Sequence, residues 1–231
     1  MLNTRRVRAI SIDLDDTLWP VRPTLERAHD SLCRWLDARA PGAAALLRDR
    51  DFVAAARQGM ALRQPSISHD VSAMRRQLIT GALAQAGADA ALMEPAFALY
   101  YAQRQQVTLF ADAEPALAHL ARRYRLVALT NGNADIHAIG LGRYFHASIS
   151  ATDVGAAKPD AAIFRAAADA VGARPKEILH IGDDPHMDGL GALQSGMQMA
   201  WINRAQAAWP FASGPQPQLV THDLEALRQL L

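Results

Sequence analysis

Short apolar segments alternate with helical patterns over most of this chain. Strands are predicted at residues 7–12, 126–129, 146–150, 177–181 and 199–202. Helices are predicted at about 115–123, after an Asp160 cap to about 171, and at the C-terminus after an Asp223 cap. Strands that alternate with helices through short loops predict a parallel sheet covered on both faces. The expected fold class is therefore α/β, a Rossmann-like parallel sheet with helices on both faces.

One long stretch departs from this alternation, because residues 24–106 carry only helical patterns. Thr24 is expected to cap its first helix and Asp89 its last. Breaks between its helices are predicted at residues 41–42, 64–66 and 87. No ordinary connection between strands is that long, so the stretch is predicted to be an inserted all-α subdomain. The predicted domains are a catalytic core of residues 1–20 and 107–231 and a helical cap of residues 21–106.

Composition narrows the class of protein. The 231 residues are half apolar and one fifth charged, as in ordinary globular proteins. The net charge of +1 argues against a dedicated nucleic-acid binder, and the single cysteine, Cys33, excludes an internal disulfide or a cysteine-clustered zinc site. Charged residues and a proline interrupt the apolar stretch 82–102, which argues against a membrane span. The apolar run after Arg8 is too short for a signal peptide, so we expect a cytoplasmic protein with a small-molecule partner.

Polar residues gather where three of the predicted strands end. They are Asp13 and Asp15 after residues 7–12, Thr130 and Asn131 after 126–129, and Asp183, Asp184 and Asp188 after 177–181. Ligands of open parallel sheets bind outside the carboxyl ends of the strands, so these groups are expected to converge. Lys158 precedes the helix that leads into the last of these strands. Only two of the 24 basic residues are lysines, which singles this one out.

The residue types at these strand ends indicate phosphoryl transfer. Aspartates crowded together repel one another and raise their pKa values, and a divalent cation resolves that conflict. Oxygen ligands favour Mg²⁺. Lys158 and the donors around Thr130 would balance a bound dianion. A carboxylate can act as nucleophile, and Asp13 and Asp15 can divide the attack on phosphorus from protonation of the leaving alkoxide.

The order of these groups resembles the four motifs of the haloacid dehalogenase-like hydrolase superfamily, in the subfamily with a helical cap (subfamily IA). The motifs are Asp-x-Asp-x-Thr at 13–17, Thr-Asn at 130–131, Lys-Pro at 158–159 and Gly-Asp-Asp-x-x-x-Asp at 182–188. The resemblance implies that Asp13 is the nucleophile and Asp15 the acid/base. It implies that the phosphate is held by Thr130, Asn131 and Lys158, and the Mg²⁺ by Asp13, the Asp15 carbonyl and Asp183. Asp184 and Asp188 would be either further metal ligands or neighbours of the ligands.

Segments around the motifs resemble the YigB-type phosphatases of bacteria, which act on flavin mononucleotide (FMN) and on the phosphorylated ribitylaminouracil intermediate of riboflavin synthesis. The matching segments are 13–18, 22–23, 69–71, 130–134, 180–184, 195–198 and 201–202. This resemblance implies a Mg²⁺-dependent phosphatase that forms an aspartyl-phosphate, with one of those two compounds as substrate. Trp19, Arg22 and His69 are candidate substrate contacts, with Trp19 a possible stacking surface for a flat ring.

Other functions stay open on the sequence alone. The substrate could be phosphoglycolate or a sugar phosphate. A 2-haloacid dehalogenase would attack carbon with Asp13 and would need neither magnesium nor an acid at Asp15. A receiver domain uses a similar strand-end aspartate, threonine and lysine but lacks a large insert. A non-catalytic phosphate or flavin binder would not need the intact set of motifs. The oligomeric state, and whether Asp184 or Asp188 touches the metal, stay open as well.

Overall fold

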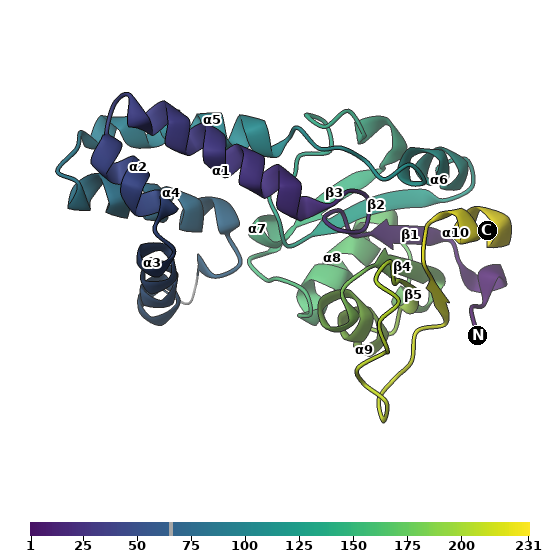
Figure 1. The fold of residues 1–231 in the computed structure, drawn as a ribbon. Helices are drawn as coiled ribbons and strands as arrows, with labels where there is room; N and C mark the ends of the chain where they lie inside the picture. The colour runs from purple at the N-terminus through teal and green to yellow at the C-terminus, as the bar shows by residue number, and fades with distance from the viewer. Residues whose placement is uncertain (65–66) are drawn as a thin grey trace. The chain divides into compact units, whose positions relative to one another are not determined.

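Six parallel strands form one sheet in the computed structural model, which describes residues 1–64 and 67–231 (Figure 1). The strands are β1 (Ala9–Ile12), β2 (Arg125–Thr130), β3 (Ala147–Ser150), β4 (Ile178–Gly182), β5 (Gln198–Ile202) and β6 (Leu219–Thr221). Their order across the sheet is β3-β2-β1-β4-β5-β6. β1 therefore lies between β2 and β4 and is buried along its whole length. A strand buried on both faces has an almost wholly apolar sequence, as this one does.

Helices cover both faces of this sheet, with α8 and α9 on one side and α6 and α10 on the other (Figure 1). The sheet and these helices form a compact unit of residues 1–20 and 108–231, which we call the core unit. Its helices are η1 (Thr4–Arg6), α6 (Ala113–Leu120), η4 (Gly142–Tyr144), α7 (Ala151–Val154), α8 (Ala161–Val171), η5 (Pro175–Glu177), η6 (Pro185–Leu190), α9 (Gly191–Gln194) and α10 (Glu225–Leu230). The α/β fold class is confirmed.

The two aspartates predicted to cap helices of the core unit both accept hydrogen bonds from N–H groups at the helix starts. The Asp160 carboxylate accepts from the Ala162 N–H at 2.8 Å, at the start of α8. Asp223 accepts from the Glu225 N–H at 3.0 Å, at the start of α10. Each carboxylate satisfies a backbone donor that the helix itself leaves without a partner. α8 then buries an apolar face that includes Phe164, and this packing fixes the segment just before it, where Lys158 lies.

Residues 21–107 form a second compact unit, which we call the helical unit. It contains α1 (Val21–Asp37), α2 (Pro41–Arg48), α3 (Arg50–Arg63), α4 (Val71–Gln85), η3 (Ala90–Leu92) and α5 (Met93–Arg104). Its core is formed by apolar side chains from α1, α2, α4 and α5, among them Leu32, Leu36, Leu47, Ile79, Leu83 and Phe97. Asp89 accepts from the Ala91 N–H at 2.9 Å and caps η3, which leads into α5. Of the helices within the described ranges, none combines the length and apolar content needed to cross a membrane.

Three local predictions need correction or fall outside the description. α1 begins at Val21, so Thr24 is buried inside the helix and does not cap it. Pro23 does not delay the start, because the first N–H groups of a helix have no intrahelical partner to lose. β6 was not predicted, because three residues are too short to carry a period of two. Of the break predicted at 64–66, Gln64 ends α3, whereas Pro65 and Ser66 lie outside the described residues.

Candidate active site

Asp13 and Asp15 lie on a tight loop that follows β1. The Asp13 N–H donates to the Ile181 carbonyl at 2.9 Å, which extends the ladder between β1 and β4 before the chain turns. Asp16 adopts a left-handed conformation with φ of 60°, which aspartate tolerates better than most residues. Its N–H donates to the Trp19 carbonyl at 2.7 Å, and the Trp19 indole N–H donates to the Asp15 carboxylate at 2.9 Å. These bonds hold both candidate catalytic carboxylates at one strand end.

Lys158 reaches the same strand end from the loop before α8. Its Nζ donates to Asp13 Oδ1 at 2.5 Å and to Asp188 Oδ1 at 2.7 Å, and none of the three side chains is more than 9% exposed. Asn131 fixes the lysine backbone by accepting from the Lys158 N–H at 2.7 Å and donating to its carbonyl at 3.0 Å. The side-chain amide of Asn131 therefore positions the lysine.

Three carboxylates gather beside this lysine. Oxygen atoms of Asp13, Asp183 and Asp188 all lie within 4.8 Å of one another. The buried Thr17 hydroxyl lies 3.1 Å from Asp13 Oδ2 and 3.2 Å from Asp183 Oδ1, and the Trp201 indole N–H donates to the Asp183 carbonyl at 2.7 Å. A donor set made only of oxygen suits a hard cation such as Mg²⁺, so these residues fit the metal that the motifs imply.

The pKa values in this cluster follow from burial and crowding. Burial raises the pKa of Asp13 well above its usual range, while the Lys158 ammonium opposes that shift. Burial, followed by the charges of Asp188 and Asp16, raises the pKa of Asp183 to about 7. For Asp188 burial also acts upward, but Lys158 and His180 together hold its pKa below the usual range. Asp13 and Asp183 therefore resist ionisation, whereas Asp188 does not. An added cation would stabilise the ionised forms of Asp13 and Asp183.

Three groups of the core unit contact the Asp188 carboxylate. Its Oδ1 accepts from Lys158 and lies 3.0 Å from His180 Nε2, while its Oδ2 accepts from the Asp184 N–H at 3.1 Å. The other ring nitrogen of His180 lies 2.8 Å from the Ser11 hydroxyl, so both ring nitrogens of this buried histidine have partners. Asp184 instead uses Oδ1 to cap η6, where it accepts from two backbone N–H groups at 2.7 Å. Asp188, and not Asp184, belongs to the cluster of three carboxylates.

These groups line an open pocket of about 190 Å³ in the core unit. Its lining consists of Asp13, Asp15, Asp16, Thr130, Asn131, Gly132, Lys158, Asp183, Asp184, Met187 and Asp188. Met187, which the sequence did not single out, is 38% exposed and is the apolar side chain of this lining. The available signal was its place inside the fourth motif, between Asp184 and Asp188. His186 lies outside the lining and contacts Phe211, at 6.2 Å between ring centroids.

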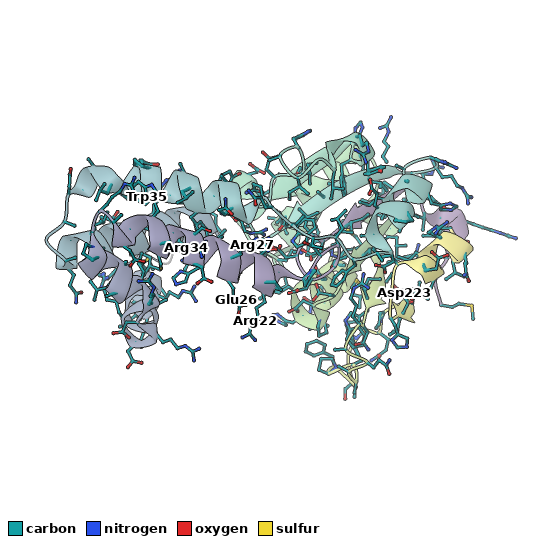
Figure 2. All side chains as sticks on the ribbon, turned by 45° about the horizontal axis from the view of Figure 1, so that its top comes forward. Arg22, Glu26, Arg27, Arg34, Trp35 and Asp223 are labelled. Carbon is teal, nitrogen blue, oxygen red and sulfur yellow. The ribbon has the colours of Figure 1, made fainter. Side chains whose placement is uncertain are left out.

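The three candidate substrate contacts lie outside this pocket lining. Trp19 has no exposed surface, and its ring N–H is used by Asp15, so the expected stacking face is not available. Arg22 and His69 belong to the helical unit. Figure 2 shows Arg22 beside Glu26, and the two form an exposed ion pair at 2.8 Å. His69 is half-buried in the turn before α4.

The fold and this cluster define a hydrolase class. A family model described as haloacid dehalogenase-like hydrolase matches residues 7–196, and the chain belongs to that family. Its sequence is 34% identical over 206 residues to 5-amino-6-(5-phospho-D-ribitylamino)uracil phosphatase YigB of Escherichia coli (strain K12), a match that covers 85% of this chain and 84% of that protein. It is also 32% identical over 136 residues to phosphoserine phosphatase of Thermus thermophilus, covering 56% of this chain and 55% of that protein.

A solved structure matches nearly the whole chain. The structure described as 2-haloacid dehalogenase from Pseudomonas syringae pv. Tomato DC3000 is 33% identical, has a TM-score of 0.91, and is matched over 97% of both chains. The curated relatives are named as phosphatases, whose reaction is attack on phosphorus. The solved structure is described as a dehalogenase, whose reaction is attack on carbon. The family together with the two curated relatives supports a phosphatase.

Proposed function

We propose that this hydrolase is a Mg²⁺-dependent phosphatase of small phosphate monoesters that works through a phosphorylated Asp13. The observation that carries the proposal is the Lys158 ammonium shared by Asp13 and Asp188, with Asp183 completing the carboxylate cluster. A buried cation beside a nucleophilic carboxylate favours the approach of a phosphate dianion, which the carboxylates alone would repel. The YigB and phosphoserine phosphatase relatives support this chemistry.

Two carboxylates divide the reaction. Asp13 attacks phosphorus, so a bond forms between its oxygen and phosphorus while the bond to the leaving oxygen breaks. Asp15, oriented by the Trp19 indole N–H, donates a proton to that leaving alkoxide. Asp15 then takes a proton from water, which attacks phosphorus, releases phosphate and restores Asp13. Thr130, Asn131 and Lys158 hold the phosphoryl oxygens. Mg²⁺, when bound by Asp13, the Asp15 carbonyl and Asp183, supplies positive charge for the transition state.

The substrate we propose is the phosphorylated ribitylaminouracil intermediate of riboflavin synthesis, or FMN. The support is the identity to YigB over most of both chains, together with the exposed Met187 in the pocket lining. An apolar side chain beside the phosphate site suits a leaving group that carries a flat heterocycle. We also propose that the helical unit is the cap subdomain of this family, with Arg22 and His69 as its substrate contacts.

The test compares phosphate release from FMN, ribitylaminouracil phosphate, phosphoglycolate and a sugar phosphate, measured as kcat/KM with Mg²⁺ and with excess chelator. We expect the first two to be the better substrates and chelator to stop turnover. Asp13→Asn should lower kcat by about 10⁴-fold or more, because the nucleophile is lost. Asp169→Asn, an exposed aspartate of α8, is the matched control. If phosphoglycolate is hydrolysed far better than FMN, the substrate is wrong; if Asp13→Asn keeps its rate, the mechanism is wrong.

Dehalogenation is the second candidate, because the Pseudomonas syringae structure matches nearly the whole chain at 33% identity. Attack on carbon needs neither a metal nor an acid at Asp15, so that reaction would leave the carboxylate cluster without a use. The discriminating measurement is halide release from 2-chloropropionate in excess chelator. Halide release at a rate above phosphate release from every ester tested would favour this second candidate.

A further inference from the structure

The helical unit contains a second cavity, a groove of about 600 Å³ lined by residues of α1, α2, α3 and α4. This volume is within the range of small-molecule sites. Its lining combines four guanidinium groups with two carboxylates, so positive charge is in excess. Leu25, Leu47 and Val53 provide apolar surface between the charged groups. The groove therefore combines the two features that recognise an organic anion.

Two of the four arginines already have partners within the helical unit. Arg48 donates to both carboxylate oxygens of Asp37 at 2.7 Å. Arg75 donates to the Tyr100 hydroxyl at 3.1 Å, and its guanidinium lies 4.3 Å from the centroid of the Tyr100 ring. These interactions fix two walls of the groove. Because Tyr100 is a neutral partner, the contact leaves the positive charge of Arg75 uncompensated.

The guanidinium groups of the other two arginines, Arg50 and Arg57, are exposed and make no hydrogen bond or ion pair to any residue within 1–64 or 67–231. They lie seven residues apart on α3, which is two turns, so they share one face of the helix. Val53 and Ala54 lie between them on that face and also line the groove. This spacing places one guanidinium group at each end of a short apolar strip formed by Val53 and Ala54.

The pKa of His29, a residue of the groove lining, reflects the charges around the groove. Burial lowers the pKa of its imidazole, the nearby charges of Arg75, Arg48 and Arg57 add to that shift, and the Asp30 carboxylate opposes it. Glu26, the other carboxylate of the lining, is already paired with Arg22 at 2.8 Å, so the arginines outweigh the carboxylates around the imidazole. A neutral histidine surrounded by arginines is the environment in which an added anion is stabilised.

We propose that this groove binds a small organic anion, a carboxylate or phosphate group on an apolar body. Arg50 and Arg57 hold the anionic group, and Leu25, Leu47 and Val53 contact the body. Guanidinium groups suit both kinds of oxyanion, because their paired N–H groups match two oxygens. The inference does not rest on the proposed phosphatase activity, since all of these residues belong to the helical unit.

The experiment is calorimetric titration of the whole 231-residue chain with phenylphosphonate, whose carbon–phosphorus bond a phosphatase does not hydrolyse. Benzoate provides the carboxylate arm, and inorganic phosphate provides an arm without an apolar body. We expect Arg50→Gln combined with Arg57→Gln to weaken phenylphosphonate and benzoate binding at least about tenfold. Arg63→Gln, an exposed arginine of α3 outside the groove, and Thr130→Val in the core pocket should change the groove affinity less than about twofold.

Three outcomes would overturn the proposal. Wild-type protein that binds neither phenylphosphonate nor benzoate has no such site. Equal affinities in the wild type and the Arg50/Arg57 double variant, or binding lost only in Thr130→Val, would place the anion in the core pocket. Inorganic phosphate bound as tightly as phenylphosphonate would remove the role assigned to the apolar strip. The thermal midpoint of each variant checks folding. For the arginine variants it should stay at the wild-type value, because Arg50, Arg57 and Arg63 are exposed.

Discussion

Gly182 is the residue at which a single methyl group should do most damage to the candidate active site. It ends β4, directly before Asp183. A Cβ atom at this position would lie 2.3 Å from Cγ and 2.4 Å from Oδ2 of Asp188. Ordinary contact begins at 3.4 Å, so the carboxyl group would have to retreat by about 1 Å. Gly182→Ala therefore perturbs Asp188 without changing any group that carries charge.

The cost follows from what Asp188 holds. Its carboxylate binds the Lys158 ammonium at 2.7 Å, lies 3.0 Å from His180 Nε2 and accepts from the Asp184 N–H at 3.1 Å. Overpacking costs about 1–3 kcal/mol, and strain on a buried ion pair adds to it. We expect a loss of roughly 2–4 kcal/mol in the free energy of unfolding. At about two to four degrees per kcal/mol, the unfolding midpoint of the core unit should fall by roughly 4–16 °C.

The assay measures both thermal unfolding and phosphate release from FMN with Mg²⁺. A displacement of about 1 Å at a reacting centre can cost about 10²-fold in rate, and we expect a fall of that order in kcat. Gly214→Ala is the matched control in the core unit, because a Cβ there meets its nearest neighbour at an ordinary 3.5 Å. A Gly182→Ala variant with the stability and rate of the Gly214→Ala control would show that Asp188 is not displaced.

Three further perturbations test other parts of the molecule. Lys158→Met should abolish phosphate release and cost about 3–5 kcal/mol of stability, because it leaves the buried Asp13 carboxylate without its cation; denaturant unfolding in which the variant matches the wild type would contradict this. Trp201→Phe keeps an aromatic ring but removes the 2.7 Å hydrogen bond to the Asp183 carbonyl. The apparent affinity for Mg²⁺, measured by titrating activity with the metal, should fall while the KM for FMN stays the same. An unchanged Mg²⁺ titration would contradict this prediction. Burial and neighbouring arginines lower the pKa of His29, so the unfolded chain takes up a proton at a higher pH than the folded chain does. The helical unit should therefore lose stability as the pH falls from about 7 to about 5.5, and a His29→Gln variant should lose less. Thermal midpoints that depend on pH equally in the wild type and the variant would contradict this prediction.

Local patterns in the sequence were sufficient to predict much of the sheet. The apolar run before Asp13 and the one before Thr130 became β1 and β2, because a strand buried on both faces needs such a run. The caps at Asp160 and Asp223 were predictable because an aspartate before an apolar periodic segment satisfies the first N–H groups of a helix. The start of α1 was not, because a proline in a first helical turn looks the same in sequence as a proline in a loop.

The order of the polar strand ends was enough to predict which residues of the candidate site come together. Asp13, Thr130, Lys158 and Asp183 line one pocket because parallel strands end at the same edge of a sheet. The sequence could not predict that Trp19 would be buried, because burial depends on how its loop folds back onto β1. The exposure of Met187 could not be predicted either, since it depends on the π-helical turn η6, which places this side chain in the lining.

The α/β class, the inserted helices and the set of charged groups could be predicted from residue types and short periods. Which carboxylates share the lysine could not, because it depends on the folded chain. Asp184 and Asp188 are alike in sequence, yet Asp184 caps η6 while Asp188 binds Lys158. The physical reason is distance: a hydrogen bond or an ion pair acts over a few ångströms, and residues 30 positions apart in the chain come within that range only once the fold is formed.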